Sequence, residues 1–221
     1  MPSHANVLSF RRRLLRWFRH NGRDLPWRRT RDPYRVLVSE FMLQQTRAPR
    51  VVHYYDRFLQ RYPSLEALAR ARPAAVREAW EGLGYYARVR NLHRLAQEIV
   101  KGRGGRLPTE PAELARLPGV GLYTAAAVAT FAYERRVVPV DTNIARVLYR
   151  AFGVPRHATT RARQHVARLA ERLLPRNRKS TWALNQALMD LGALICTARK
   201  PRCPECPVRR ECMRNGVGRE T

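Results

Sequence analysis

The sequence predicts an all-α fold, and three observations lead to that fold class. Apolar residues recur at helical spacing in several separate segments, proline and glycine divide these segments, and no segment alternates apolar with polar residues as a half-buried strand does. The chain has 221 residues, of which 45% are hydrophobic, so it can bury a substantial core. We therefore expect helices joined by short connections.

The predicted helices follow one another along the chain, and each carries one apolar stripe. The first holds Val7, Phe10, Leu14 and Phe18, with arginines between them. Three later stripes have the same spacing: Val52, Tyr55 and Leu59; Val89, Leu92, Ala96 and Ile99; and Val166, Leu169 and Leu173. The punctuating residues are Pro26, Pro33, Pro63, Pro73, Gly102, Gly104, Gly105, Pro108, Pro118 and Pro155.

The charge of the chain predicts a polyanionic partner. Lysine and arginine total 43 against 17 acidic residues, which gives a formal net charge of +26. Nucleic acid is the usual partner of such a surface. Genomic bias would explain why only Lys101, Lys179 and Lys200 are lysines, but it does not explain the shortage of acids.

The N-terminal residues give no sign of export or of a membrane anchor. Arginines interrupt the first twenty residues, and no run of eighteen apolar residues occurs in the sequence. We expect a protein without membrane association that stays where it is made, in a cytoplasm of the prokaryotic type and close to the nucleoid.

Four cysteines form a candidate metal site near the C-terminus. Cys196, Cys203, Cys206 and Cys212 have the spacing C-x6-C-x2-C-x5-C, and cysteine occurs nowhere else in the chain. Clustered thiols without an export signal favour a metal over disulfides. Zinc sites usually pair two short knuckles, whereas only one is present here, so the spacing favours an iron–sulfur cluster and leaves zinc open. Five basic residues of the same loop would offset the charge of the thiolates: Arg199, Lys200, Arg202, Arg209 and Arg210.

The segment Leu117–Gly121 predicts a hairpin between two helices. Gly119 and Gly121 flank Val120, and an apolar helical segment follows. Such a turn exposes the amides at the N-terminus of the second helix as an anion site. In a chain this basic, the hairpin predicts a clamp on the DNA backbone that grips without reading sequence.

Two carboxylates lie in apolar surroundings. Glu40 lies within Val36–Leu43, and Asp141 follows Val137–Val140. Asp141 also has the ordinary alternative of capping a helix. A buried carboxyl holds its proton more readily and can act as a general acid, while a second one can stabilise a sugar cation. The pair suits the cleavage of a glycosidic bond.

These residues together resemble a known family. The chain is similar to adenine DNA glycosylases of the MutY type, within the endonuclease III-like helix-hairpin-helix superfamily, from about Phe10 to Cys212. Six motifs carry the resemblance: Leu25–Arg28, Ser39–Thr46, Gly82–Tyr86, the hairpin, Val140–Asn143 and Met189–Cys196. The cysteine spacing is also that of the family, so the resemblance implies a [4Fe-4S] cluster as cofactor.

The resemblance implies a two-lobed all-α fold. Residues 22–135 would form a six-helix barrel lobe with the hairpin, and residues 1–21 and 136–221 would form the lobe with the iron–sulfur cluster loop. Double-stranded DNA containing a mismatch would be the partner of a monomeric protein. The target nucleotide would be flipped out of the stack.

The resemblance also assigns catalytic roles position by position. Glu40 corresponds to the acid that protonates the adenine and handles the water, and Asp141 to the carboxylate that stabilises the sugar cation. Tyr123 corresponds to a hydroxyl that contacts the catalytic glutamate, and Asn143 to a supporting polar group. Bifunctional relatives have a lysine where this chain has Tyr123, so we expect a monofunctional enzyme without strand-nicking activity.

Further positions correspond to residues that contact DNA. The wall around the flipped base would be formed by Trp27, Arg28, Leu43 and Gln186. Gln45 and Tyr85 would be wedged into the DNA stack. Trp27, Leu43 and Tyr85 have the alternative of being ordinary core residues, and Gln186 that of an ordinary helix-surface residue.

Three departures from the adenine-specific pattern leave the excised base open. The sequence ends soon after the cysteines, so we expect weaker recognition of 8-oxoguanine. Ala48 replaces the usual valine, and Thr142 replaces a glycine. Thymine/uracil·guanine mismatch glycosylases share the small residue at Ala48, whereas Gln44, Gln45 and Gln186 resemble the adenine enzymes. We expect adenine removal opposite guanine or 8-oxoguanine, with thymine or uracil removal as the alternative and a non-catalytic DNA-binding module as a third.

Overall fold

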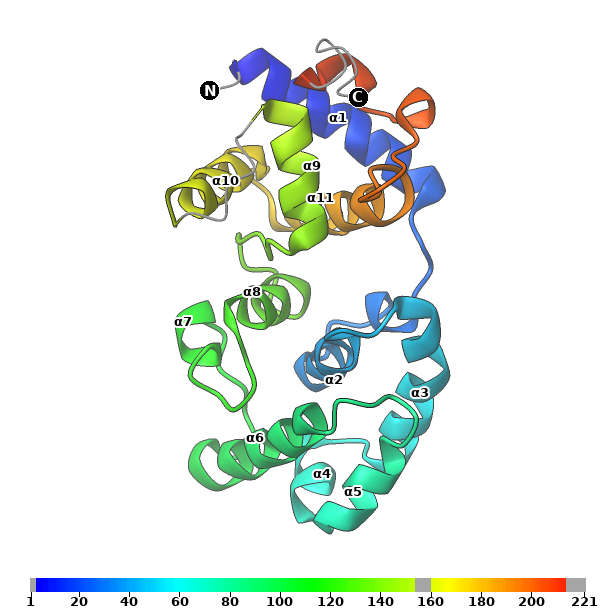
Figure 1. The fold of residues 1–221 in the computed structure, drawn as a ribbon. Coiled ribbons are helices and arrows are strands. Elements are labelled where there is room, and N and C mark those ends of the chain that lie inside the picture. Colours follow the sequence, from blue (N-terminus) through cyan, green and yellow to red (C-terminus); the bar gives the residue numbers. More distant parts are fainter. Residues whose placement is uncertain (1–2, 154–159, 214–221) are drawn as a thin grey trace. The chain divides into compact units, whose positions relative to one another are not determined.

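The computed structural model describes residues 3–153 and 160–213, and within them it contains helices and loops but no β-strand (Figure 1). The predicted all-α class is confirmed. The chain separates into two compact units, one formed by Asp24–Arg135 and the other by Met1–Arg23 with Arg136–Thr221.

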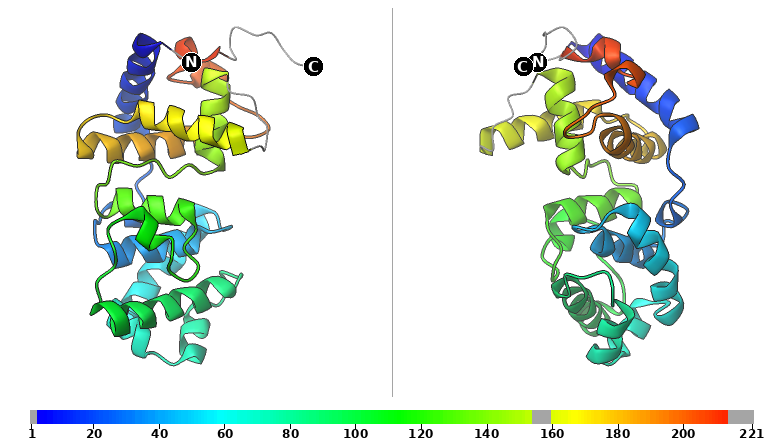
Figure 2. Two further views of the ribbon diagram at one scale, coloured as in Figure 1. Left: turned by 90° about the vertical axis from the view of Figure 1, so that its left-hand side faces the viewer. Right: turned by 45° about the vertical axis from the view of Figure 1, so that its right-hand side comes forward.

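The unit Asp24–Arg135 is a helical assembly around one core. Its elements are η1 (Pro26–Arg28), α2 (Pro33–Leu43), α3 (Ala48–Arg61), α4 (Leu65–Arg70), α5 (Pro73–Ala79), α6 (Ala87–Arg103), α7 (Pro111–Leu114) and α8 (Leu122–Phe131). Helix α2 packs against α3, α6 and α8, and α6 also packs against α4 and α5 (Figure 2). The central position of α2 explains why most of its side chains are buried.

The apolar stripes of this unit define the core, with one shift from the prediction. In α6, Val89, Leu92, Ala96 and Ile99 are all buried, as predicted. In α3 the buried stripe consists of Val51, Tyr55 and Phe58, whereas Val52 and Leu59 are only half-buried. The stripe predicted for α3 was therefore displaced by one residue at two positions, because the neighbouring Val51 and Phe58 are equally apolar and Phe58 packs edge-on against Trp80.

The second unit is built from α1 (His4–Asn21), α9 (Thr142–Phe152), α10 (Thr160–Leu173), α11 (Arg178–Asp190), the π-helical turn η2 (Leu191–Ile195) and the short turns η3 (Cys203–Glu205) and η4 (Arg209–Glu211). Helix α1 packs on α10 and α11, and α9 packs on α10, α11 and η2. Val7, Phe10 and Leu14 of α1 lie in the same core as Leu169 and Leu173 of α10. The predicted stripes of α1 and α10 are confirmed, with Phe18 at the edge of this core.

Side chains at the helix starts fix where the key elements begin. Asp32 accepts a hydrogen bond from the amide of Arg35, and Pro33 occupies the first turn of α2. Asp141 caps α9 in the same way. Among the described residues, none of the helices combines the length and the apolarity needed to cross a bilayer.

Candidate functional site

Glu40 is placed in the most deeply buried helix of its unit. It lies in the last turn but one of α2, and its residue surface is only 4% exposed. Its neighbours on both sides, Val38, Phe41 and Met42, are completely buried. Burying an ionised carboxyl group is costly, because the charge loses its hydration. The burial of Glu40 therefore marks it as a functional candidate.

The hairpin between α7 and α8 contains two glycines, and their surroundings differ in the room that they leave for a side chain. Gly119 has φ +72°, and a Cβ there would lie 2.7 Å from the Cβ of Asn91 and 3.0 Å from the ring of Phe41. Gly121 caps α8 with φ −80°, and a Cβ there would meet nothing within 4 Å. Val120 between them is buried, whereas both glycines are exposed. The fold itself requires Gly119, whereas a side chain at position 121 would extend into open space.

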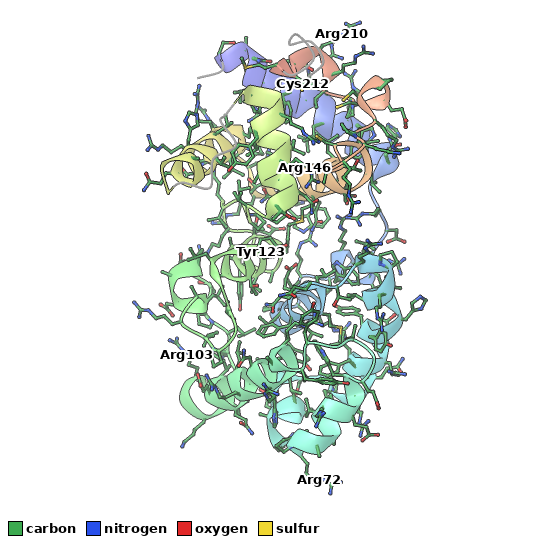
Figure 3. All side chains as sticks on the ribbon, in the orientation of Figure 1. Arg72, Arg103, Tyr123, Arg146, Arg210 and Cys212 are labelled. Carbon is green, nitrogen blue, oxygen red and sulfur yellow. The ribbon has the colours of Figure 1, made fainter. Side chains whose placement is uncertain are left out.

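Tyr123 lies in the first turn of α8 and is half-buried (Figure 3). Helix α8 packs against α2, the helix that carries Glu40. Gln44, directly after α2, donates hydrogen bonds from its side-chain amide to the carbonyl of Gly119 and the hydroxyl of Thr124, each at 3.4 Å. The end of α2 is thereby tied to the hairpin and to the start of α8.

Asp141 belongs to the other unit, and both of its carboxylate oxygens are used. Oδ1 accepts the backbone N–H of Ile144 at 2.7 Å, and Oδ2 accepts the side-chain amide of Asn143 at 2.7 Å. The first bond is a helix N-cap, so the structural alternative considered for Asp141 is confirmed. The capping role orients the carboxylate and does not compete with a catalytic one.

A chain of hydrogen bonds runs from Asp141 to the cysteine loop. Asn143 accepts a bond of 2.7 Å from Arg146, whose guanidinium also donates to the carbonyls of Gly192 and Cys196 at 2.7 and 2.8 Å (Figure 3). A Cβ on Gly192 would lie 2.7 Å from the Cβ of Asn143, so glycine is needed for η2 to approach α9. The polar partners of Asp141 are thus anchored on the turn that carries Cys196.

The four cysteines are free thiols, and three of them pack against the core of their unit. Cys196, Cys206 and Cys212 are half-buried, and Cys203 is exposed. The pKa of Cys206 is raised to about 11, mainly by burial and in small part by the other three cysteines, against the lowering effect of a bond from the Val208 amide. Cys196, Cys206 and Cys212 thus lie against one and the same core cluster.

An arginine of α9, Arg150, contacts a cysteine sulfur. Arg150 donates to Sγ of Cys196 at 3.4 Å and to the carbonyl of Thr197 at 2.7 Å, while its own carbonyl accepts a bond of 3.4 Å from the thiol of Cys212. Sequence reasoning missed Arg146 and Arg150, because on α9 alone they are indistinguishable from other solvated arginines.

The cysteine loop is also pinned to α1. Glu211 is buried. It accepts a hydrogen bond of 2.7 Å from Ser9 and forms an ion pair of 2.7 Å with Arg13. Among the five basic residues predicted around the thiolates, Arg202 donates to the carbonyl of Leu194 at 2.7 Å and ion-pairs with Glu205 at 3.1 Å. The loop is therefore held by side chains from α1 and α9 as well as by its own turns.

The donor set near the C-terminus consists of four thiols. In the described part of the chain, no three His, Cys, Asp or Glu side chains converge closely enough to hold one metal ion. A single tetrahedral zinc needs all its sulfurs about 2.3 Å from one point. Thiols become thiolates when a positively charged iron core compensates their charge. The residues present thus fit an iron–sulfur group held by four thiolates.

The remaining predicted site residues are distributed over both units. In the unit Asp24–Arg135, Trp27 is buried and packs edge-on against Tyr55 at 5.5 Å, Arg28 and Leu43 are half-buried, and Ala48 begins α3. Gln186 lies in α11 of the other unit and is 4% exposed, so the surface alternative for Gln186 is wrong. Trp27 is part of the core, as its alternative allowed, whereas Tyr85 is 60% exposed and its core alternative is wrong.

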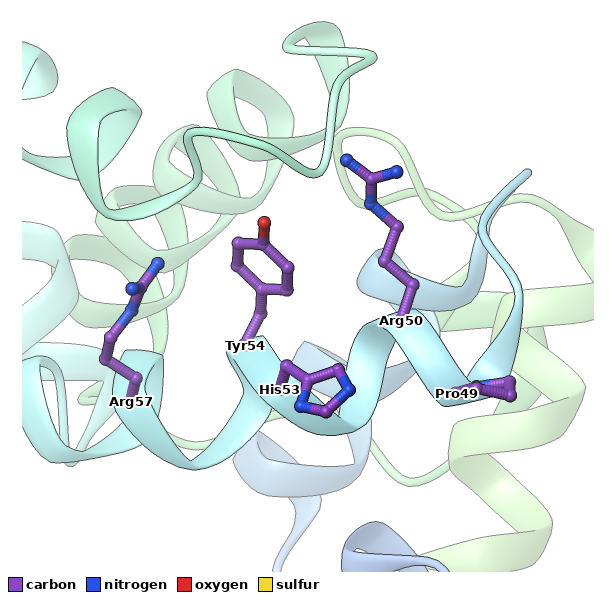
Figure 4. Close-up of a pocket in the computed structure, with 5 residues that line it drawn as sticks. All are labelled: Pro49, Arg50, His53, Tyr54 and Arg57. Atoms are coloured by element: carbon purple, nitrogen blue, oxygen red, sulfur yellow. The ribbon is translucent and has the colours of Figure 1, made fainter.

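A basic pocket that the sequence did not reveal lies on α3. It encloses about 590 Å³ and is lined by Pro49, Arg50, His53, Tyr54 and Arg57 (Figure 4). The guanidinium of Arg57 lies 5.2 Å from the ring centre of Tyr54, and Arg50 donates to the carbonyl of Gly82. The pocket therefore borders the Gly82–Tyr86 motif.

Comparison with known proteins gives the family. Residues 38–187 match the HhH-GPD superfamily of base excision DNA repair proteins. The chain belongs to this superfamily. The matched region begins in α2 before Glu40 and ends in α11 after Gln186.

Three relatives illustrate the kinds of protein that the chain resembles. The chain is 41% identical to the adenine DNA glycosylase of Rattus norvegicus over 97% of this chain and 44% of the relative. It is 46% identical to the adenine DNA glycosylase of Mycobacterium tuberculosis over 88% of this chain and 64% of the relative. The thymine-DNA glycosylase of Aeropyrum pernix is 40% identical over 95% of both chains. The chain thus spans less than half the length of the rat relative and under two thirds of the mycobacterial one.

Two solved structures share the fold. A thermostable thymine-DNA glycosylase superposes with a TM-score of 0.89 at 32% identity, covering 96% of this chain and 97% of that one. Endonuclease III in a trapped covalent complex with DNA superposes with a TM-score of 0.82 at 22% identity, covering 98% of each chain. The second likeness concerns the fold alone.

Proposed function

We propose that this protein is a monofunctional DNA glycosylase that removes a mispaired adenine opposite guanine or 8-oxoguanine in double-stranded DNA. The observation that carries the proposal is the burial of Glu40 on α2, within the region that matches the base excision repair superfamily. The adenine assignment is supported by the two adenine-specific relatives at 41% and 46% identity. We further propose that it acts as a monomer.

Glu40 is proposed as the general acid. A carboxylic acid in a water-poor site can protonate a ring nitrogen of adenine and so turn the base into a better leaving group. Tyr123, on the helix packed against α2, is proposed to orient Glu40 by its hydroxyl. Because a phenol cannot form a Schiff base, Tyr123 supports hydrolysis that leaves an abasic site without cutting the strand.

Asp141 is proposed as the carboxylate that stabilises the positive charge that develops on the sugar. Its two oxygens accept from Ile144 and Asn143, which leaves lone pairs on both while fixing their direction. Asn143 is in turn fixed by Arg146. A preorganised carboxylate loses no free energy to reorientation when the charge appears.

Four residues are proposed to hold a [4Fe-4S] cluster: Cys196, Cys203, Cys206 and Cys212. The cluster would cross-link the segment after η2 to the turns η3 and η4. Its bound form would supply a fixed, charged anchor in this unit, and the carbonyl of Cys196 would be held where Arg146 reaches it.

DNA binding is proposed to combine the hairpin with two kinds of side chain. The amides after Gly121 would contact phosphate, which the open space in front of this glycine allows. Gln45 and Tyr85 would enter the stack, and Trp27, Arg28, Leu43, Ala48 and Gln186 would surround the flipped base.

A second candidate substrate is favoured by the relative from Aeropyrum pernix. That thymine-DNA glycosylase matches 95% of this chain, and a thermostable thymine-DNA glycosylase superposes with a TM-score of 0.89. Ala48 would give a thymine methyl group more room than valine does. Removal of thymine or uracil opposite guanine is therefore the alternative.

One experiment tests the proposal. Purified protein is incubated with duplexes that contain A·G, A·8-oxoguanine, T·G or U·G, and strand cleavage is measured with and without hot alkali. We expect adenine excision that is revealed only by alkali. Excision of thymine or uracil with adenine untouched would replace the first assignment by the second, and no excision from any duplex would reject both.

A further inference from the structure

Arg88 is a buried arginine that no part of the proposed chemistry uses. It lies in the first turn of α6 and is 6% exposed. Its guanidinium donates to six main-chain carbonyl oxygens, and none of these acceptors is a carboxylate. The acceptors come from two segments that lie about forty residues apart in sequence.

The first segment is the C-terminal end of α2. One guanidinium nitrogen, Nη1, donates to the carbonyls of Phe41 at 3.1 Å, Met42 at 2.7 Å and Gln44. The last carbonyls of a helix have no partner within it and carry its negative end. The next residue, Gln45, is exposed and has φ +57°, a left-handed conformation that a residue with a side chain rarely adopts. Arg88 thus fixes the backbone from which Gln45 projects.

The second segment is the loop that ends at Tyr85. Nη2 of Arg88 donates to Leu83 at 3.1 Å and Gly84 at 3.0 Å, and Nε donates to Tyr85 at 3.4 Å. Tyr85 also has a left-handed φ of +47°, and the centre of its exposed ring lies 5.5 Å from the guanidinium carbon. The same planar group therefore holds the backbone of both strained, exposed residues.

The arrangement opposes the stability of the unit in two ways. Burial disfavours the charged guanidinium and lowers the pKa of Arg88. The left-handed conformations of Gln45 and Tyr85 add strain, and strained exposed residues are typical of functional segments. An apolar residue could fill the space of Arg88 but could not hold two loops in register, since only the guanidinium offers five donors in one rigid plane.

We propose that Arg88 is a positioning residue that holds Gln45 and Tyr85 in fixed relation, so that both side chains enter the DNA stack together. The inference rests on the proposed function, because it assigns Arg88 to the step that opens the duplex before excision. It adds a residue to that step that does not itself contact DNA. A misplacement of about 1 Å in such a group can cost about a hundredfold in rate.

The test uses Arg88→Lys, with Arg94→Lys as matched control. Lysine keeps the charge but has one nitrogen, so it cannot serve both segments. Arg94 lies on the same helix, where it is exposed and pairs with Glu98. Single-turnover excision is measured on two duplexes with the same target mismatch. In one the flanking pairs are normal, and in the other both neighbours are mismatched, so that the target is already unstacked.

We expect Arg88→Lys to be about ten- to a hundredfold slower than the unaltered protein on the normal duplex. On the opened duplex it should be within about threefold, because the wedge is not needed there. Arg94→Lys should match the unaltered protein on both. An equal loss on the two duplexes, or no loss on either, overturns the inference. Should Arg88→Lys melt below the assay temperature, Arg88→Gln, which removes the buried charge, replaces it in the same comparison.

A second readout separates failure of the inference from failure of the proposed function. A 2-aminopurine placed beside the mismatch becomes fluorescent when it is unstacked. The unaltered protein should raise this fluorescence on binding, and Arg88→Lys should bind without raising it. If the unaltered protein excises nothing, the proposed function fails, yet the fluorescence still tests whether Arg88 positions Gln45 and Tyr85. Equal fluorescence with both proteins overturns it.

Discussion

The two candidate carboxylates are held in opposite ways. Glu40 lies in a helix surrounded by completely buried apolar side chains, whereas Asp141 is half-buried and held by an amide, a side-chain amide and, beyond them, Arg146. The surroundings of Glu40 are apolar, whereas those of Asp141 are hydrogen-bond donors. Apolar packing therefore supports one candidate acid, and a polar network tied to the cysteine loop supports the other.

The largest loss of excision rate is expected when each candidate acid is replaced by its amide, which removes the charge and keeps the shape. Glu40→Gln and Asp141→Asn keep size and hydrogen-bonding ability, so both proteins should fold, yet each should lose about a hundredfold or more in single-turnover excision. Thermal melting checks the fold. Because asparagine caps helices as well as aspartate, Asp141→Asn should melt like the unaltered protein. Asp141→Ala should in addition lose about 1 kcal/mol of stability with the cap. Excision by Asp141→Asn at the normal rate would reduce Asp141 to a cap.

Loss of a cysteine should affect the unit that contains Asp141 and the cysteine loop, and leave the unit Asp24–Arg135 folded. Cys203→Ser should lower the iron content and the broad absorbance expected near about 400 nm, and it should reduce solubility. Phosphate binding by the hairpin should persist in the folded fraction, because the unit Asp24–Arg135 does not contain the cysteines. Metal analysis that finds zinc and no iron in the unaltered protein would contradict the proposed cluster.

Substitutions at the two hairpin glycines, which lie in the unit Asp24–Arg135, should separate DNA binding from stability. Affinity for undamaged duplex should fall steeply with salt, since several phosphates are neutralised. Gly121→Val should preserve the melting temperature and weaken binding to all sequences alike, whereas Gly119→Val should lower the melting temperature because its side chain would clash with Asn91 and Phe41. Filter binding and thermal melting distinguish the two variants. Unchanged affinity of Gly121→Val would contradict the phosphate clamp.

The smallest expected effect concerns the choice of base. Gln186 is buried and offers both a donor and an acceptor to an adenine edge. Gln186→Leu should reduce adenine excision and shift the ratio of A·G to T·G activity by about 1–3 kcal/mol, as for one group in a recognition pocket. Competition between the two duplexes in one tube measures the ratio. An unchanged ratio would place the selectivity elsewhere in the pocket.

Local residue patterns are enough to predict the helical class and most of the buried stripes, and they single out the candidate acids, the hairpin and the cysteines. These features depend on residue type and local spacing: Val89, Leu92, Ala96 and Ile99 repeat with the helical period, and the two glycines mark a turn wherever the chain goes. The displaced stripe of α3 shows the limit, since adjacent apolar residues give two phases that only packing separates.

Tertiary structure alone decided which of the many arginines matter. Arg88, Arg146 and Arg150 look like the other arginines in the sequence. Their partners are carbonyls, a side-chain amide and a thiol, contributed by residues 41, 42, 44, 83–85, 143, 192, 196 and 197 among others. The tertiary structure likewise shows that Asn91 and Phe41 leave no room for a Cβ at Gly119, whereas a Cβ at Gly121 would meet open space. The physical reason is that a guanidinium or a missing Cβ acquires its role from the atoms around it, and those atoms come from chain segments that no local pattern connects.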